Sequence, residues 1–517
     1  MNLAPVDLVI IAIYAISVLI VARLVSTKPQ NTQSYFLADK SLKWWAIGPA
    51  LIAANFSVEH ILGFCKDGYT LGLAIAAYEW LAALAMILVA KYILPIFLKR
   101  GIYTVPQFLQ QRYDIRVRWA LAVFYIGINI FAPLTALLWI SATAINILTG
   151  MPFVFALLCL GFFSISYWLY GGLRVIAFTG MLHVVVILLG CFLIAGIALD
   201  KVAEALEDNG AIEGLRYLFS QSPERFELIL SADNNSYSYL PGIWVLVGGI
   251  WVLNIWYWGF NQYIIQPALA AKNLRQGQIG IIFAATIKLF IPILVLPGIA
   301  AAILIPDVEQ QDNIFYRIMD IMPSGVIGII IAAVLASSIS TLAATVNSIA
   351  TIFTMDLYAF FRKEHNQAKL LKVGRVVAVV AMAIGLIVAK LFNNIYQVLQ
   401  YLWNISSFII PGIVAIFILG LYWDKTTITG VLAAAISSVL ISLFVYMFFP
   451  STPFLNRMAL VFFGCIASGI IVSLWEGKKV QPGSVDLTST DFSTTVLFNC
   501  IAIAVALVVG VLYVLFW

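Results

Sequence analysis

Charged residues are scarce in this sequence of 517 residues. Asp, Glu, Lys and Arg make up 10% of the chain, against roughly 25% in ordinary soluble proteins, while 63% of the residues are hydrophobic. This balance excludes a soluble globular protein. The 29 Lys and Arg residues outnumber the 24 Asp and Glu residues, but they are scattered through short connections and form no basic stripe. The sequence therefore predicts no nucleic-acid partner.

Residues that hold metals or perform covalent chemistry are also few. The cysteines lie in apolar runs without CxxC spacing, which predicts neither a zinc site nor a disulfide framework. No cluster of His, Cys or carboxylate residues has the spacing of a metal site, and no nucleophile accompanies a base in a recognisable motif. We therefore expect no enzyme activity. The cysteines are Cys65, Cys159, Cys191, Cys465 and Cys500.

Long apolar runs dominate the chain instead. A helix needs about 20 apolar residues to cross a bilayer core of about 30 Å, and the sequence holds fourteen runs of this kind. The first run is interpreted as a retained helix rather than a signal peptide, because no Lys or Arg precedes it and Arg23 follows it. The prediction is an all-α, multi-pass protein of the cell membrane with about fourteen transmembrane helices.

The distribution of basic residues predicts the orientation of these helices. Of the 29 Lys and Arg residues, 21 fall in the connections after the odd-numbered runs, 7 fall in the others, and Lys288 lies inside a run. Basic residues are retained on the cytoplasmic side, so the even number of runs places both termini outside. Residues 200–239, with eight acids and three bases, then form an external loop.

Two runs carry polar residues deep within them, at 53–60 and 254–262. Helices that unwind in the membrane expose backbone groups that bind an ion or a substrate. Because these runs are five apart, we expect two five-helix halves of opposite topology, each starting with a broken helix. The predicted parts are an extra helix in 1–30, repeats at 44–199 and 240–421, the external loop at 200–239, and three added helices in 424–517.

A few ionisable residues lie deep in the runs, among them Glu59, His60, Glu79, His183 and Lys288. Each costs a few kcal/mol in hydrocarbon, so each needs a partner or a water-filled cavity. Glu79 and Lys288 are interpreted either as an ion pair that joins two helices or as part of a substrate site, and the two roles are compatible. His60 is either a ligand or a core histidine, and His183 is interpreted as structural.

Hydroxyl residues follow one face of the ninth run at spacings of three and four residues. A small cation without its water needs several oxygen ligands, which such a face can provide together with the carbonyls of an unwound helix. The alternative is that these hydroxyls bond back to their own helix or join helices together. The residues are Ser337, Ser340, Thr341, Thr345 and Ser348.

Several motifs resemble those of the sodium/solute symporter family, in particular its sodium/glucose and sodium/galactose branch. They are AANFSVEHILGF, AAYEW, YWLYGGL, NIWYWGFNQYIIQ and NSIATIFTMDLY, and they stand in the family's order between about residues 34 and 425. The resemblance implies a LeuT-like fold with a 5+5 inverted repeat. It also implies Na⁺ as the coupling ion, with no organic cofactor.

The same resemblance implies positions for both ligands. Tyr257 matches the tyrosine that closes the site on the cytoplasmic side. The implied sodium site consists of the carbonyls of Ala53 and Phe56 with Ser337, Ser340 and Thr341, where the family has an alanine carbonyl at the position of Ser337. The implied substrate residues are Asn55, His60, Glu79, Asn254, Tyr257 and Lys288, and Trp403 takes the position of a substrate-contacting glutamine.

Two departures from the family bear on function. An indole at Trp403 can stack on a sugar but cannot replace the paired donor and acceptor of an amide. Gly180 stands where the family commonly has an aspartate, and Ala343 and Ala344 follow the hydroxyls of the ninth run. These absences predict one sodium ion per solute.

The sequence thus predicts a sodium-coupled symporter that imports a small neutral solute, a sugar or a polyol, by alternating access within the lipid bilayer. One alternative is a symporter of the same family for another organic solute, such as an inositol, a nucleoside or an amino acid. Another is a weakly coupled sugar sensor or leak protein, which the loss of the aspartate at Gly180 would permit.

Overall fold

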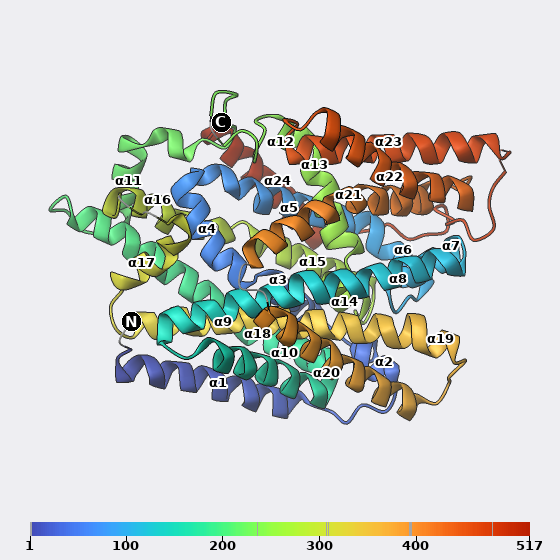
Figure 1. The fold of residues 1–517 in the computed structure, drawn as a ribbon, viewed down its shortest axis with the longest axis horizontal. Helices are drawn as coiled ribbons and strands as arrows, with labels where there is room; N and C mark the ends of the chain where they lie inside the picture. The colour runs from blue at the N-terminus through green and yellow to red at the C-terminus, as the bar shows by residue number, and fades with distance from the viewer. Residues whose placement is uncertain (1–2, 235, 307, 309, 392–394, 478) are drawn as a thin grey trace.

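The computed structural model describes residues 3–517 except 235, 307, 309, 392–394 and 478, and the side chains of 395–406 are also not described. Within this part every regular element is a helix, apart from a single bridge between Leu42 and Ala271. Figure 1 shows most of the long helices running along the long axis of the molecule, as in a bundle that crosses a bilayer.

Most helices are connected by short turns and loops, the connections at 222–243 and 476–495 are longer, and several helices are joined by 3-10 or π segments. The α-helices are α1 (Pro5–Val25), α2 (Thr32–Leu37), α3 (Trp44–Asn55), α4 (Val58–Thr70), α5 (Ala77–Leu88), α6 (Leu94–Arg100), α7 (Val105–Arg112), α8 (Ile115–Asn129), α9 (Thr135–Thr149), α10 (Phe153–Glu204), α11 (Ala211–Gln221), α12 (Trp244–Val247), α13 (Gly249–Ile255), α14 (Gln262–Leu269), α15 (Leu274–Lys288), α16 (Val295–Leu304), α17 (Ile314–Asp320), α18 (Val326–Ile352), α19 (Ala359–Phe361), α20 (Gln367–Leu391), α21 (Ile395–Tyr422), α22 (Ile428–Phe448), α23 (Phe454–Trp475) and α24 (Val496–Leu515). The joining segments are η1 (Ala38–Lys40), η2 (Gly72–Ala76), η3 (Val89–Ile93), η4 (Ile130–Leu134), η5 (Pro223–Phe226), η6 (Trp256–Phe260), η7 (Ile291–Leu294), η8 (Gln311–Asn313) and η9 (Phe353–Tyr358).

Ten helical stretches of the described chain are long and apolar enough to cross a membrane, and the bent pair α3 and α4 makes an eleventh if it counts as one span. The protein is therefore an all-helical, multi-pass membrane protein. The sequence contains fourteen apolar runs, three more than these eleven spans. The two counts differ at residues 152–199, 240–266 and 395–421. The ten stretches are Pro5–Val25, Gly72–Arg100, Ile115–Thr149, Phe153–Glu204, Leu274–Leu304, Val326–Phe361, Gln367–Leu391, Ile428–Phe448, Phe454–Trp475 and Val496–Leu515.

The first of these places is α10, which contains 52 residues. A straight helix of this length would measure about 78 Å, more than twice the thickness of a bilayer core, but α10 consists of two helices that meet at a kink. Gly172 interrupts it with φ 58° and ψ −140°, a conformation that favours glycine. A Cβ atom at this position would lie 2.2 Å from the carbonyl oxygen of Tyr35, so α2 packs directly against the interruption.

The second place is the run at 240–266, which is divided into α12, α13, η6 and α14. The helix stops at Asn261, whose backbone is extended at φ −86° and ψ 119°, and starts again at Gln262. The break that the polar residues predicted in this run is therefore present. The third place is α21, whose described side chains, Ser407–Tyr422, form an apolar helix too short to count as a span by itself.

The N-terminal helix α1 is attached to α18 by a buried carboxylate. Asp7 accepts hydrogen bonds of 2.7 Å from the amides of both Gly325 and Gly328, at the start of α18. The first amides of a helix have no partner within the helix, and a negative charge at this end is favourable. Asp7 is completely buried and supplies both the acceptor and the charge.

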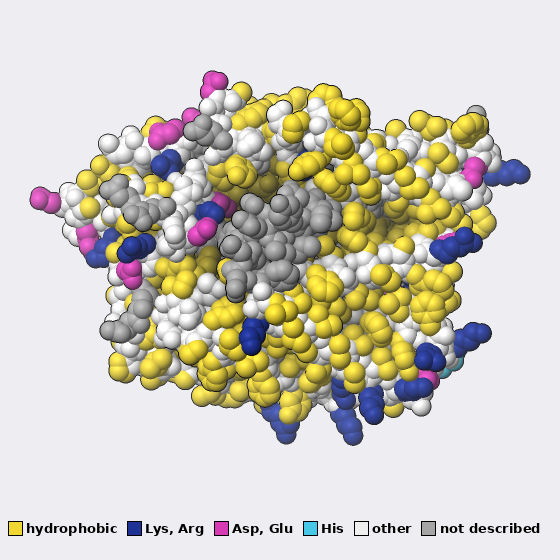
Figure 2. All heavy atoms as spheres, in the orientation of Figure 1, with side chains coloured by type: hydrophobic (Ala, Val, Ile, Leu, Met, Phe, Trp, Pro, Cys, Tyr) yellow, Lys and Arg dark blue, Asp and Glu magenta, His cyan; other side chains and the backbone are white. Residues whose placement is uncertain are grey.

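Charge is distributed unevenly along the molecule. Figure 2 shows acidic side chains mainly toward the left end, where α11 and α17 lie, and basic side chains mainly toward the right end and the lower right margin, where α2, α7 and α19 lie. Both chain termini lie in the left half of Figure 1. Residues 200–239 also belong to the left end, and they contain the helix α11 in addition to loops.

Candidate functional site

The bent pair of helices contains a break at residues 56–57. α3 ends at Asn55, α4 begins at Val58, and the two helices differ in direction by 61°. In a continuous helix the amide of Ser57 would donate to the carbonyl of Ala53, but here it donates to Nδ1 of His60 at 3.3 Å. The Ala53 carbonyl therefore has no helical partner and can bind another group.

Hydroxyl groups of α18 contact this carbonyl. The Oγ atom of Ser340 lies 2.7 Å from the Ala53 oxygen and also 2.7 Å from the Ala336 carbonyl of its own helix, and Oγ1 of Thr341 lies 3.3 Å from the Ala53 oxygen. Both hydroxyls also contact the carbonyl of Ser337, at 3.2 and 2.9 Å. All five residues are buried. The break and the hydroxyl face of α18 thus form a cluster of uncharged oxygen atoms. Oxygen atoms are the ligands that small hard cations bind.

The other two residues of the expected ion site have different contacts. The hydroxyl of Ser337 donates to the Val334 carbonyl at 2.9 Å, so its own carbonyl, rather than its hydroxyl, meets Ser340 and Thr341. Phe56 lies at the break in an extended conformation, and its amide donates to Ile52. Its carbonyl accepts no hydrogen bond from α18 among the described residues.

Gly180 of α10 packs against α3 beside this cluster. A Cβ atom at residue 180 would lie 3.1 Å from the Cα atom of Ala50 and 3.6 Å from the Cβ atom of Ala53. The first of these contacts is tighter than ordinary packing allows, so α10 comes this close because residue 180 has no side chain. A carboxylate at this position would require α10 and α3 to separate.

Glu79 in α5 and Lys288 at the end of α15 form an ion pair. The two residues are 5% and 1% exposed, so both charges are removed from water. The Nζ atom of Lys288 also lies 5.1 Å from the centre of the Trp258 ring, and Nε2 of His60 lies 3.8 Å from Oε1 of Glu79. The pair suggested by the sequence is thus present, and it connects α5, α15, η6 and α4.

Tyr257 in η6 accepts a hydrogen bond of 3.1 Å from Nδ2 of Asn55, and the hydroxyl of Tyr263 donates to it at 3.1 Å. This contact links the two broken helices. The Oδ1 atom of Asn55 and the Nδ2 atom of Asn254 are buried without a hydrogen-bond partner among the described residues. Because buried polar atoms are nearly always paired, each of these two atoms is available to a polar ligand.

The structure brings most of the expected solute residues into two contact groups. His60, Glu79 and Lys288 form one, and Asn55 with Tyr257 forms the other. The side chain of Trp403 lies outside the described residues. Sequence reasoning did not select Trp258 or Tyr263, which contact Lys288 and Tyr257. The feature of the sequence that could have indicated these two residues is the high density of aromatic side chains beside the second break.

His183 has the structural contact expected of it. Its Nδ1 atom lies 3.0 Å from the hydroxyl of Tyr14, and both residues are buried between α1 and α10. This interaction attaches the N-terminal helix to the bundle.

Comparison with known proteins identifies relatives over the whole chain. The model of the sodium:solute symporter family matches residues 35–438. The chain is 38% identical over 540 aligned positions to the sodium/glucose cotransporter of Vibrio parahaemolyticus, covering 100% of this chain and 99% of the relative. It is 29% identical to the sodium/myo-inositol cotransporter 2 of Mus musculus, covering 86% and 70%.

Solved structures share the fold. A Na⁺-coupled sialic acid symporter superposes with a TM-score of 0.81 at 19% identity, covering 94% of this chain and 100% of the other. The nucleobase-cation-symport-1 family transporter MHP1 superposes with a TM-score of 0.55 at 15% identity, covering 90% and 100%. Together with the match of the family model, these findings place the chain in the sodium:solute symporter family, as a sodium-coupled transporter of a solute rather than an enzyme.

Proposed function

We propose that the protein imports a small neutral solute with several hydroxyl groups, a sugar or a polyol, together with Na⁺. The observation that carries this proposal is the buried Glu79–Lys288 pair near the broken helices, where Asn55 and Asn254 have unpartnered amide atoms. A carboxylate accepts from hydroxyl groups, an ammonium donates to them, and an amide does both. The pair carries no net charge, which suits an uncharged solute.

The names of the relatives support the same chemistry. Glucose is named for the Vibrio relative and myo-inositol for the mouse relative, and both are neutral molecules rich in hydroxyl groups. The proposed solute residues are Asn55, His60, Glu79, Asn254, Tyr257, Lys288 and Trp403. The place of Trp403 in this set rests on the sequence alone.

The proposed sodium ligands are the carbonyls of Ala53, Phe56 and Ser337 with the hydroxyls of Ser340 and Thr341. Both hydroxyls now point their protons at carbonyl oxygens. A sodium ion among them would turn these protons away and bind the oxygen lone pairs. The ion would then connect α3 to α18 more strongly than two neutral hydrogen bonds do.

Coupling follows from shared helices. The broken pair α3 and α4 supplies ligands to both sites, because Ala53 belongs to the ion cluster while Asn55 and His60 belong to the solute cluster. A ligand shifts a conformational equilibrium by its difference in affinity for the two states. We propose that joint occupancy favours closure on the outer side and opening on the cytoplasmic side, where Tyr257 acts as the gate.

The proposed topology has fourteen spans and a 5+5 inverted repeat. Eleven spans come from the helical stretches and the bent pair, α10 is counted as two because of Gly172, and the series α12–α14 and α21 add one each. The repeats are 44–199 and 240–421, preceded by one extra helix and followed by three. With this count both termini face outward in the cell membrane, and the gathering of basic side chains toward the opposite end of the molecule supports this orientation.

Uptake into proteoliposomes tests the function. Radiolabelled glucose, galactose, myo-inositol, a nucleoside and an amino acid are each offered with and without an inward sodium gradient. We expect accumulation above the external concentration for a sugar or for the polyol, and only with the gradient. Protein-free liposomes provide the background.

Three outcomes would contradict the proposal. Accumulation of the nucleoside or the amino acid alone would assign another solute class. Equal uptake with and without the gradient would indicate a leak, and saturable binding without accumulation would indicate a sensor. Trp403→Gln is measured on the same panel, and we expect it to change the order of preference among solutes.

A further inference from the structure

One cavity of the molecule lies outside the proposed transport site. It has a volume of about 1130 Å³ and is bounded by α1, the segment that follows α1, the first half of α10, and α20. None of the residues proposed for ion or solute binding lines it. The kind of ligand that this cavity fits must therefore be inferred from its lining residues.

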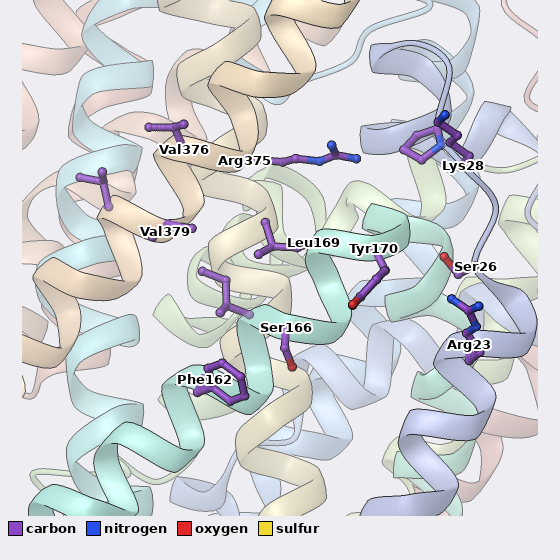
Figure 3. Close-up of a pocket in the computed structure, with 13 residues that line it drawn as sticks. Arg23, Ser26, Lys28, Phe162, Ser166, Leu169, Tyr170, Arg375, Val376 and Val379 are labelled. Carbon is purple, nitrogen blue, oxygen red and sulfur yellow. The ribbon is translucent and has the colours of Figure 1, made fainter.

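One end of the cavity is basic. Arg23, Lys28 and Arg375 line it, and the lining contains no Asp or Glu. In the described part of the chain none of these three forms an ion pair with a carboxylate, although Arg375 lies 5.3 Å from the ring centre of Tyr35. Figure 3 shows Arg375 extending from α20 toward the segment that carries Lys28. Three cations therefore line this cavity, and its lining contains no acidic side chain to balance them.

Hydroxyl groups lie near the same end. Ser26 follows α1, and Ser166 and Tyr170 lie on α10, with all three in the lining. Figure 3 shows Ser26 and Tyr170 on the side of the view where Arg23 and Lys28 lie. Hydroxyls donate to phosphate oxygens, so this end of the cavity offers both charge and hydrogen bonds to an anion.

The other side of the cavity is apolar and open to the surroundings. Phe162 on α10 is 75% exposed, and Val376 and Val379 on α20 are 53% and 48% exposed. In a membrane protein such side chains face lipid tails rather than water. Figure 3 shows these three residues on the side of the view opposite Arg23 and Lys28. The cavity therefore combines a polar end with a hydrocarbon-facing groove.

The basic end lies at the level of a membrane surface. Arg23 is in the last turn of α1, a 21-residue helix that is about 31 Å long and so matches the bilayer core. Arg375 lies eight residues after the start of α20, and Tyr170 lies just before the interruption of α10 at Gly172. The end of α1 and the interruption of α10 thus border the same cavity, and we place this level at the lipid headgroups.

We propose that this cavity binds one anionic phospholipid, with its phosphate held by Arg23, Lys28 and Arg375 and one acyl chain lying along Phe162 and α20. A basic pocket between transmembrane helices selects an anionic headgroup because a zwitterionic lipid brings its own cation to the same place. The open apolar side matches an acyl chain, which a free phosphate ion lacks. The proposal does not depend on which solute is transported.

Native mass spectrometry of the purified protein tests the site. The protein in neutral detergent is mixed with equal amounts of phosphatidylglycerol and phosphatidylcholine, and we expect one phosphatidylglycerol to remain bound. Each basic residue near a lipid headgroup contributes about fivefold in affinity, so replacing Arg23, Lys28 and Arg375 together with Gln should weaken retention on the order of 100-fold. Lys28→Gln alone changes an exposed residue in a connecting segment, and it should weaken retention about fivefold in a protein that folds normally.

The matched control replaces Arg362, Lys363 and Lys372 with Gln. These residues are exposed, carry the same total charge and lie between α18 and the first turns of α20, outside the lining of the cavity. Retention in this variant should stay within about twofold of the wild type, because distant exposed charges are screened. Equal losses in both triple variants would overturn the proposal in favour of a diffuse surface effect.

Two further outcomes would also overturn it. Retention of phosphatidylglycerol in the Lys28→Gln and triple variants at the wild-type level would show that these cations do not hold the lipid. Displacement of the lipid by an excess of inorganic phosphate, with phosphate then bound in its place, would identify a site for a free anion. Failure of phosphate to displace the lipid supports the contribution of the acyl chain.

Discussion

The Oγ atom of Ser340 lies 2.7 Å from the carbonyl oxygen of Ala53, across the contact between α18 and α3. The carbonyl is available because the amide of Ser57, its partner in a regular helix, donates to His60 instead. The hydroxyl comes from a helix 287 residues further along the chain. A ligand bound at this point is shared by the interrupted helix and by α18, so its presence affects the position of both.

Removal of the two hydroxyls tests the proposed sodium site. We expect Ser340→Ala with Thr341→Ala to reduce uptake to the level seen without a sodium gradient, because two oxygen ligands are lost while the apolar packing remains. Ser338→Ala is the control, since its hydroxyl donates to Val334 within its own helix at 2.7 Å. Sodium-dependent uptake by the double variant at the level of the control would show that the ion binds elsewhere.

Disruption of the buried ion pair tests the solute site. Glu79→Gln and Lys288→Ala should each raise the solute Kd at least about tenfold while sodium binding changes little. Loss of one partner of a buried pair typically lowers the free energy of unfolding by about 3 to 5 kcal/mol, so thermal stability is measured in parallel. Glu204→Gln breaks the exposed pair with Lys201 and should cost less than about 1 kcal/mol. Normal solute binding by both Glu79→Gln and Lys288→Ala would show that this ion pair contributes to stability and not to solute binding.

Gly180→Ala tests the close approach of α10 to α3. The added methyl group would meet Ala50 at 3.1 Å, and overpacking of this kind costs about 1 to 3 kcal/mol. Because the strain falls on α3 near Ala53, we also expect weaker sodium binding. Gly196→Ala on the same helix meets no atom within 4 Å and should stabilise the helix by roughly 0.5 to 1 kcal/mol. Equal sodium affinities in the two variants would show that the packing at Gly180 does not affect the ion site.

The expected stoichiometry is one sodium ion per solute. Beyond Thr341, the next residues of α18 include Ala343 and Ala344, and the hydroxyl of Thr345 donates to the Thr341 carbonyl at 2.8 Å. A second dehydrated ion beside Ala343 and Ala344 would have fewer oxygen ligands than one at Ser340 and Thr341. The solute gradient that cancels a fixed sodium gradient in proteoliposomes at zero voltage should depend on the first power of the sodium ratio. A dependence on the square would indicate two coupled ions.

The sequence predicted the parts of the site that depend on local polarity. A polar stretch inside an apolar run indicated both breaks, and the structure has them at residues 56–57 and at Asn261. Two deep charges of opposite sign indicated the pair of Glu79 and Lys288, since neither charge is stable alone in hydrocarbon. Spacings of three and four residues indicated that Ser340 and Thr341 share one face of a helix.

Other features depend on contacts that no local pattern reveals. The hydroxyl of Ser337 had two possible partners, and only the packed structure shows that it bonds back to Val334. The interruption of α10 at Gly172 falls between the two predicted runs, but the close approach of Gly172 to the carbonyl of Tyr35 depends on packing that no pattern of apolar residues shows. The basic cavity joins residues 23 and 28 with residue 375, which are too far apart in the chain for any motif to connect them.

The carboxylate of Asp7 also has a consequence for biosynthesis. Its partners Gly325 and Gly328 are 318 and 321 residues further along the chain. When α1 leaves the ribosome, more than half of the protein has not been made, and the amides that it will bind do not yet exist. A carboxylate near the end of a membrane helix can remain at the water interface during this time. The attachment of α1 through Asp7 is therefore a late step of assembly, which is possible only after α18 has entered the bilayer, whereas its contact with His183 of α10 can form earlier.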